Sequence, residues 1–130
     1  MSDIPSHLKY TSEHLWLEIT GNTATLGLTD YAQEQLGEIL HIELPDAGMN
    51  VTESDDMASV ESIKTNTEVF APLSGTITDV NHELDETPTL LNEQPYTDGW
   101  IAQLEISDVK ELEELLSDQD YADYLDSLDE

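Results

Sequence analysis

The chain is organised around the segment Val60-Glu61-Ser62-Ile63-Lys64-Thr65-Asn66-Thr67-Glu68-Val69. Apolar runs at 57–60 and 69–71 flank a short polar tip, and this pattern predicts two strands joined by a tight turn. Asn66 tolerates the unusual backbone angles that such a turn needs. The tip also carries Lys64, in a chain with 3 Lys and Arg residues against 30 acidic residues. We therefore predict a hairpin that presents an exposed amine to a modifying enzyme, although an ordinary solvated turn lysine has the same spacing.

The composition limits the partners that the protein can bind. Its 130 residues carry a formal net charge of −27. Nucleic acids and anionic membrane surfaces are bound through Lys and Arg side chains, so neither is expected as a partner. We expect partners with basic faces, which the negative charge attracts and steers at low salt. Adaptation to a saline cytoplasm is an alternative explanation of the same composition.

Cysteine is absent, and the apolar runs are short. Without a thiol, any redox chemistry must come from an attached group. No run approaches the roughly 20 apolar residues of a membrane-spanning helix, and the first residues lack the apolar core of a signal peptide. We expect a single domain at 1–130, located in the cytoplasm or, in a eukaryote, in the mitochondrial matrix.

Blocks of sequence on both sides of Lys64 follow the order and spacing of a known family. The lysine block, 60–64, is followed by Ala71-Pro72-Leu73-Ser74-Gly75. The other blocks are Gly27-Leu28-Thr29-Asp30-Tyr31-Ala32-Gln33, Leu36-Gly37-Glu38-Ile39, Ile42-Glu43-Leu44-Pro45, Leu91-Asn92, Pro95-Tyr96 and Gly99-Trp100. Together they resemble the glycine cleavage system H-protein family, from Leu8 to about Leu128.

The resemblance implies a mainly β fold, a flattened β-barrel or sandwich of the lipoyl/biotinyl (barrel-sandwich hybrid) type. An internal repeat agrees with it, because Gly37-x-Ile39-x-x-Ile42 and Gly75-x-Ile77-x-x-Val80 match at an offset of 38 residues. Such a repeat suggests two halves related by pseudo-symmetry. We expect N-terminal strands within 8–28, a lipoyl core at about 37–106 and acidic C-terminal helices at about 108–129.

Helix signals lie between the first strands and the core, and again at the C-terminal end. A short helix is predicted near 30–36, with Asp30 as its N-cap and Gly37 at its end. The last strand is predicted at 99–106, with one face formed by Trp100, Ala102, Leu104 and Ile106. Beyond it, leucines and tyrosines at helical spacing predict two helices. Their candidate caps are Ser107 or Asp108 for the first, and Ser117 or Asp118 for the second.

The function that the resemblance implies is that of a lipoyl carrier rather than an enzyme. Lipoate would be attached to Lys64 by an amide. The arm would carry the aminomethyl group of glycine and reducing equivalents among the P-protein (glycine decarboxylase), the T-protein (aminomethyltransferase) and the L-protein (dihydrolipoyl dehydrogenase). Lipoylating enzymes would be further partners, and we expect a monomer.

The resemblance also assigns residues around the arm. In this family the loaded arm folds into a surface cleft, and the matching positions are Glu13, Thr67 and Glu68. Glu61 matches an acidic residue implicated in recognition by lipoylating enzymes. The sequence departs from the family at three positions, where Leu15 replaces Glu, Thr65 replaces Ala and Ser54 replaces a turn Gly. Leu15 removes one candidate polar contact for the loaded arm, and the three departures together leave open an H-like protein that serves as a lipoyl donor for other complexes.

Other constellations are absent from the sequence. The histidines His7, His14, His41 and His82 show no metal-ligand spacing, so no metal site is expected. His14 is expected at the surface or in a local hydrogen bond. A biotin carrier has Met on both sides of its lysine, where this chain has Ile63 and Thr65. An acidic interaction module without the modification is the alternative from a different class.

Overall fold

The computed structural model describes residues 4–128, so the ends of the expected domain, at 1–3 and 129–130, lie outside the described residues. The strands are β1 (Lys9–Tyr10), β2 (Leu15–Thr20), β3 (Thr23–Leu28), β4 (Ile39–Glu43), β5 (Asn50–Val51), β6 (Asp56–Ser62), β7 (Asn66–Phe70), β8 (Gly75–Val80) and β9 (Ala102–Ile106). The helices are α1 (Asp30–Leu36), α2 (Glu83–Glu86), α3 (Leu90–Glu93), the 3-10 helix η1 (Val109–Glu114) and α4 (Asp118–Leu128).

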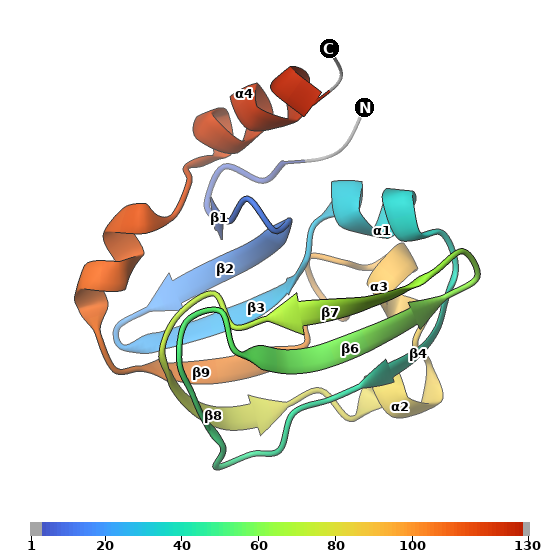
Figure 1. Ribbon diagram of the computed structural model, residues 1–130, viewed down its shortest axis with the longest axis horizontal. Helices are drawn as coiled ribbons and strands as arrows, with labels where there is room; N and C mark the ends of the chain where they lie inside the picture. Colours follow the sequence, from blue (N-terminus) through green and yellow to red (C-terminus); the bar gives the residue numbers. More distant parts are fainter. Residues whose placement is uncertain (1–3, 129–130) are drawn as a thin grey trace.

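The described strands form two antiparallel sheets. A 6-stranded sheet has the order β1-β2-β3-β9-β8-β5, and a 3-stranded sheet has the order β4-β6-β7. The smaller sheet lies across the larger one (Figure 1). Apolar side chains from both sheets, including Leu17, Leu26, Ile42, Val60 and Leu104, form one buried core between them. The predicted mainly β architecture with two layers is confirmed.

The N-terminal strands form where the alternating pattern predicts them. β2 and β3 pair from Leu15↔Leu28 to Thr20↔Thr23, and Gly21 makes the turn between them with φ 60°. Gly27 has a separate role, because a Cβ there would lie 2.8 Å from the Trp16 indole nitrogen. That nitrogen donates a hydrogen bond to the carbonyl of Pro95, 2.7 Å away. The strand pair therefore also fixes the loop before β9.

The short helix α1 begins as predicted, but its N-cap is Thr29 and not Asp30. Thr29 has extended backbone angles, and its hydroxyl accepts a hydrogen bond from Ala32 N. This is the geometry of an N-cap. Asp30 is the first helical residue, and its carboxylate accepts a bond from Gln33 Nε2 at 2.8 Å instead. Gly37, at φ 75°, ends the helix.

The internal repeat of the sequence has a structural counterpart. β4 contains a register shift between Ile39 and His41, and β8 contains one between Ile77 and Asp79. The two bulges are thus separated by the 38 residues that separate the repeated sequences. A β-bulge leaves one extra residue unpaired and bends its strand. The two repeated segments therefore share a local backbone feature as well as a residue pattern.

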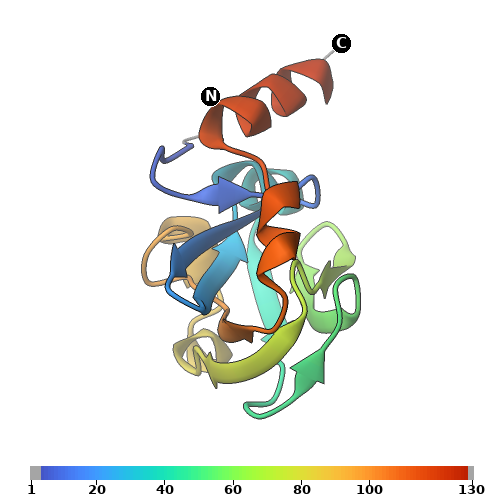
Figure 2. The ribbon, with the colours of Figure 1, turned by 90° about the vertical axis from the view of Figure 1, so that its left-hand side faces the viewer.

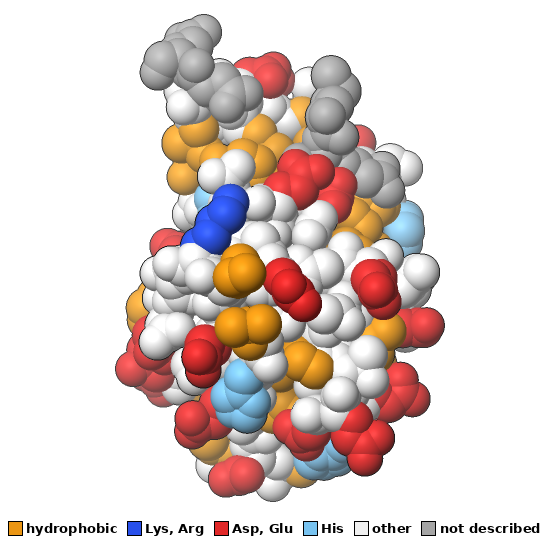
Figure 3. Space-filling model, turned by 90° about the vertical axis from the view of Figure 1, so that its right-hand side faces the viewer, with side chains coloured by type: hydrophobic (Ala, Val, Ile, Leu, Met, Phe, Trp, Pro, Cys, Tyr) orange, Lys and Arg blue, Asp and Glu red, His pale blue; other side chains and the backbone are white. Residues whose placement is uncertain are grey.

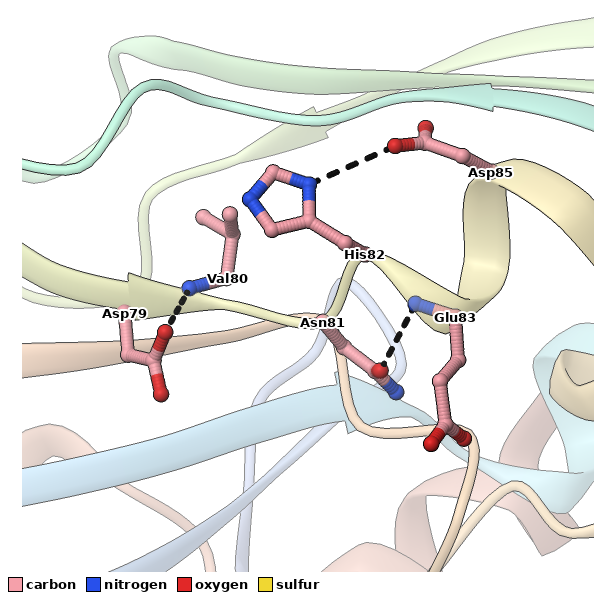
Figure 4. A network of polar contacts seen from close by, with 6 residues as sticks. All are labelled: Asp79, Val80, Asn81, His82, Glu83 and Asp85. Carbon is pink, nitrogen blue, oxygen red and sulfur yellow. Dashed lines mark hydrogen bonds and ion pairs between the residues drawn. The ribbon is translucent and has the colours of Figure 1, made fainter.

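The last strand starts later than predicted. It begins at Ala102, and Trp100 lies outside it, packed against a second apolar cluster instead of the core. The cause is Asn81, whose buried side chain donates hydrogen bonds to the carbonyls of Asp98 and Trp100. These contacts hold residues 98–100 in a loop. Figure 4 shows Asn81 at this corner, where its oxygen also accepts a bond from Glu83 N at the start of α2.

The C-terminal segment runs past the ends of β9, β3 and β2 (Figure 1), and α4 lies above β1 (Figure 2). Its first helix, η1, is a 3-10 helix rather than an α-helix, and the predicted Asp108 caps it. Ser117 caps α4, since its hydroxyl accepts a hydrogen bond from Asp120 N. The ring of Tyr121 stacks on that of Tyr10 with a centroid distance of 4.8 Å. This stack is the centre of the second apolar cluster, which joins α4 to the N-terminal strands.

Candidate functional site

Lys64 lies at the tip of the β6–β7 hairpin. The two strands pair from Asp56↔Phe70 to Glu61↔Asn66, so the predicted hairpin is confirmed. The lysine is exposed in the turn between them, and among residues 4–128 it forms no ion pair. Its amine is therefore accessible from solvent.

The backbone of the tip is held by Ser62. The Ser62 hydroxyl donates a hydrogen bond to the carbonyl of Thr65 at 2.9 Å and accepts bonds from the backbone nitrogens of Lys64 and Thr65. Ser62 is also buried, with 5% of its surface exposed. The sequence pattern did not predict the role of this serine in the turn. The available signal was a hydroxyl residue two positions before Lys64, at the end of an apolar strand.

A second element supports the tip from the side. The Ile63 amide donates a hydrogen bond to the Glu38 carbonyl at 2.9 Å. A Cβ placed on Gly37 would lie 3.3 Å from both Ile63 Cγ2 and Lys64 Cε, so the missing side chain makes room for the lysine. The corner itself is held by Asn92, which donates to the Gly37 carbonyl and accepts from Ile39 N. The lysine thus rests on a fixed corner between α1 and β4.

Beside the hairpin lies a cleft of about 320 Å³. Its apolar side chains include Leu28, Leu36, Val69 and Phe70. The sequence-predicted residues Glu13, Thr67 and Glu68 all line this cleft, although they come from the N-terminal loop and from β7. Glu61 does not line it, and lies exposed on β6. The structure therefore brings three of the four predicted residues together, and their roles stay predictions.

The prediction that His14 lies at the surface or in a local hydrogen bond is wrong. The residue lines the cleft, and its hydrogen-bond partner is distant in the chain. Its ring is partly buried against Tyr31, and its Nδ1 lies 2.9 Å from the hydroxyl of Tyr121 in α4. Tyr121 is hydrogen bonded in turn to the Thr29 hydroxyl at 2.8 Å. Burial lowers the pKa of His14, and the charge of Glu13 opposes this in part. Burial also raises the pKa of Tyr121 to about 12.

A second cavity, of about 480 Å³, continues from the first along the N-terminal loop and shares Glu13, Leu15 and Phe70 with it. Glu53 and Glu114 also line this cavity, and a hydrogen bond with the Glu114 carboxyl raises the pKa of Glu53. Leu15 is 2% exposed and belongs to the core. The residue that departs from the family pattern therefore supplies apolar packing between the two cavities.

The site has the features that a covalently attached arm with an apolar stem requires. Lys64 offers an exposed primary amine, and a cleft of mixed apolar and acidic character lies beside the same hairpin. Among the described residues, no group of His, Cys, Asp and Glu side chains is arranged to hold a metal ion. No helix in that part of the chain is long and apolar enough to cross a membrane.

Comparisons with known proteins agree with one another. The family model described as glycine cleavage H-protein matches residues 8–128. The chain is 47% identical over 122 residues to a glycine cleavage system H protein of Staphylococcus epidermidis, covering 94% of this chain and 97% of the relative. For the protein of that name from Staphylococcus saprophyticus, the identity is 44% over the same shares.

A solved structure extends the likeness to three dimensions. The crystal structure of a glycine cleavage system H protein from Mycobacterium marinum matches with a TM-score of 0.85 and 32% identity, covering 92% of this chain and 97% of that one. The fold is therefore that of the lipoyl-domain barrel-sandwich class. Within this class, the chain belongs to the glycine cleavage H-protein family.

Proposed function

We propose that the protein is the lipoyl carrier of a glycine cleavage system, with lipoate joined to Lys64 by an amide. The observation that carries the proposal is the exposed amine of Lys64 at the tip of a supported hairpin, next to a cleft. Membership of the family supports the same function. The chain would be a non-catalytic subunit, and the reactions would take place on its partners.

Different residues of the chain would bind the stem of the arm and its charged end. A lipoyl group attached to Lys64 would supply the disulfide chemistry needed to carry an aminomethyl group and electrons, for which the chain has no thiol of its own. Leu28, Val69 and Phe70 offer apolar surface to the stem of the arm. The carboxylates of Glu13 and Glu68, on the same cleft, would attract a positively charged amine at its end. The hairpin fixes the point from which the arm moves, which raises its effective concentration at a docked partner.

The proposed partners are the P-protein, the T-protein, the L-protein and lipoylating enzymes. A net charge of −27 favours docking faces rich in Lys and Arg on each of them. The bacterial relatives point to the cytoplasm as the location. We further propose that the carrier works as a monomer, so that one hairpin reaches each partner in turn.

Glycine–bicarbonate exchange with a purified P-protein tests this function. The lipoylated protein should support exchange of labelled bicarbonate into glycine, and the Lys64→Arg variant should not. The Lys110→Arg variant is the matched control and should be as active as the parent. Lipoylated parent protein that gives no exchange with an active P-protein would contradict the assignment.

A second candidate is an H-like protein that passes lipoyl groups to other complexes. It is favoured by Leu15, a core residue that is 2% exposed, at a position where the family resemblance implies a candidate polar contact for the arm. For this candidate, lipoylated protein would fail in the exchange assay but would donate its lipoyl group to a 2-oxo acid dehydrogenase subunit in the presence of a transferase.

A further inference from the structure

Two large aliphatic side chains are exposed close to Lys64. Ile63, the residue before the lysine, is 64% exposed, and Leu40 on β4 is 48% exposed. Single exposed aliphatic residues are common on protein surfaces and need no explanation. Here the pair belongs to adjacent segments, because β4 pairs with β6 immediately before the tip. Figure 3 shows hydrophobic side chains on this face of the molecule, with acidic side chains around them and basic atoms beside them.

Leu40 is the extra residue of the bulge in β4, and it is exposed, unlike Met57, the extra residue of the register shift in β6. Ile39 pairs with Ser62 and His41 pairs with Glu61, which leaves Leu40 as the extra residue. The bulge in β8 provides an internal comparison. There Thr78 occupies the corresponding position and is exposed. The backbone geometry therefore accepts a polar residue, and packing of the fold does not explain an aliphatic one at Leu40.

The side chain of Ile63 is similarly dispensable for the turn. The tip is held by the Ile63 amide, which donates to the Glu38 carbonyl, and by the hydroxyl of Ser62. Both contacts are independent of the Ile63 side chain, most of which faces solvent. An aliphatic residue at this position therefore exposes apolar surface without a compensating structural role.

Carboxylates frame the two aliphatic side chains. Glu38 precedes Leu40 by two residues on the segment that leads into β4, and Glu61 lies on β6 opposite His41. Both glutamates are exposed, and within residues 4–128 neither forms an ion pair. An apolar centre with an acidic rim complements a protein face that has an apolar centre and a rim of Lys or Arg.

We propose that Leu40, Ile63 and Glu38 form a docking platform for the enzyme that acylates Lys64, next to Glu61, for which the family resemblance already implies a role in that recognition. This inference rests on the proposed function and adds the surface by which the acylating enzyme recognises the chain. The Lys64 amine attacks the carbonyl of lipoyl-AMP held by that enzyme. The amide C–N bond forms, the bond from the carbonyl carbon to the phosphate oxygen breaks, AMP leaves, and the amine releases its proton to solvent. The platform contributes binding and leaves this chemistry unchanged.

Steady-state lipoylation of the unmodified protein tests the platform. A lipoate–protein ligase is supplied with lipoate and MgATP, and the modified protein is quantified by intact mass. The test variants are Leu40→Thr, which copies Thr78, and Ile63→Thr. The controls are Val109→Thr and Leu128→Thr, which remove exposed apolar side chains elsewhere on the surface. All four sites are exposed, and unfolding midpoints verify that each variant folds.

The platform predicts a change in KM for the protein substrate. Each test variant should raise KM about fivefold to tenfold with kcat unchanged, since about one aliphatic contact is lost in each. The controls should match the parent. In the double variant Glu38→Gln/Glu61→Gln, kcat/KM should decrease less steeply with added salt than it does in the parent.

The possible outcomes separate the platform from the proposed function. Test variants with the kcat/KM of the parent overturn the platform and leave Lys64 as the attachment site. A lower kcat with an unchanged KM also overturns it, because the residues would then act by positioning the lysine. If the parent protein itself gains no lipoyl group on Lys64, both the platform and the proposed function are wrong.

Discussion

At the scale of single residues, the hairpin tip depends on one buried hydroxyl. Ser62 bonds to both backbone groups of Thr65, its Oγ accepting from the nitrogen at 3.1 Å and donating to the carbonyl at 2.9 Å. We expect Ser62→Ala to destabilise the protein by about 1 kcal/mol, a typical value for a net hydrogen bond. Amide exchange at Lys64 and Thr65 should also become faster. Ser59→Ala, on the same strand, is the control, and unchanged exchange at the tip in Ser62→Ala would contradict this role.

Ser54 stands where the family has a turn glycine, and its backbone conformation is one that favours glycine. Its φ is 77°, a region that glycine adopts freely and that L-residues with a side chain adopt at a cost. We expect Ser54→Gly to raise the free energy of unfolding by about 0.5–1 kcal/mol, because relief of strain exceeds the extra entropy of the unfolded chain. Urea denaturation measures the change. Gly48→Ser, at φ 92°, should have the opposite sign. A destabilised Ser54→Gly protein would show that Ser54 is unstrained.

At the scale of elements, His14 connects the N-terminal loop to α4 and to the cap of α1 through Tyr121. Burial lowers the pKa of His14 from its ordinary value of 6.5. As the pH falls below 6.5, the unfolded chain takes up the proton first, so the contribution of this residue to stability decreases until the folded pKa is passed. Above 6.5 the contribution is constant.

We therefore expect the stability advantage of the parent over His14→Asn to be largest above pH 6.5 and to shrink as the pH falls. Asn suits the comparison because it tolerates the φ of 69° at this position. The titratable groups around the ring are Glu13, Tyr31, Tyr121 and Tyr124. Urea denaturation at several pH values measures the difference in stability between the parent and the variant. An NMR titration measures the pKa of His14. An NMR midpoint at or above 6.5 would contradict the assigned burial effect.

The sequence predicted elements well where the signal is local. The β6–β7 hairpin, the β2–β3 hairpin and the end of α1 at Gly37 follow from alternation and turn residues. The N-cap of α1 was misplaced by one residue, and two other errors occur where a group elsewhere in the chain decides the local structure. Trp100 lies outside the last strand because the side chain of Asn81, 19 residues earlier, donates a hydrogen bond to its carbonyl. His14 is hydrogen bonded to Tyr121, which lies near the other end of the chain. Such pairings leave no periodic trace in a single sequence.

At the scale of the whole molecule, the charge distribution opposes folding. With 3 basic and 30 acidic side chains, most carboxylates have acidic rather than basic neighbours. Ions that screen the repulsion should stabilise the folded state. We expect the free energy of unfolding to rise on the order of 1 kcal/mol between low salt and 1 M KCl, as a consequence of shorter screening lengths. Urea denaturation at a series of KCl concentrations measures it, and stability that falls with salt would show that attractive surface pairs dominate.

The central claim is that the amine of Lys64 is the attachment point of a mobile group. The intact mass of the protein after incubation with a lipoate–protein ligase, lipoate and MgATP tests it directly. We predict a single lipoyl adduct, retained in Lys9→Arg and Lys110→Arg and lost in Lys64→Arg. No adduct, or an adduct that persists in Lys64→Arg, would contradict the account.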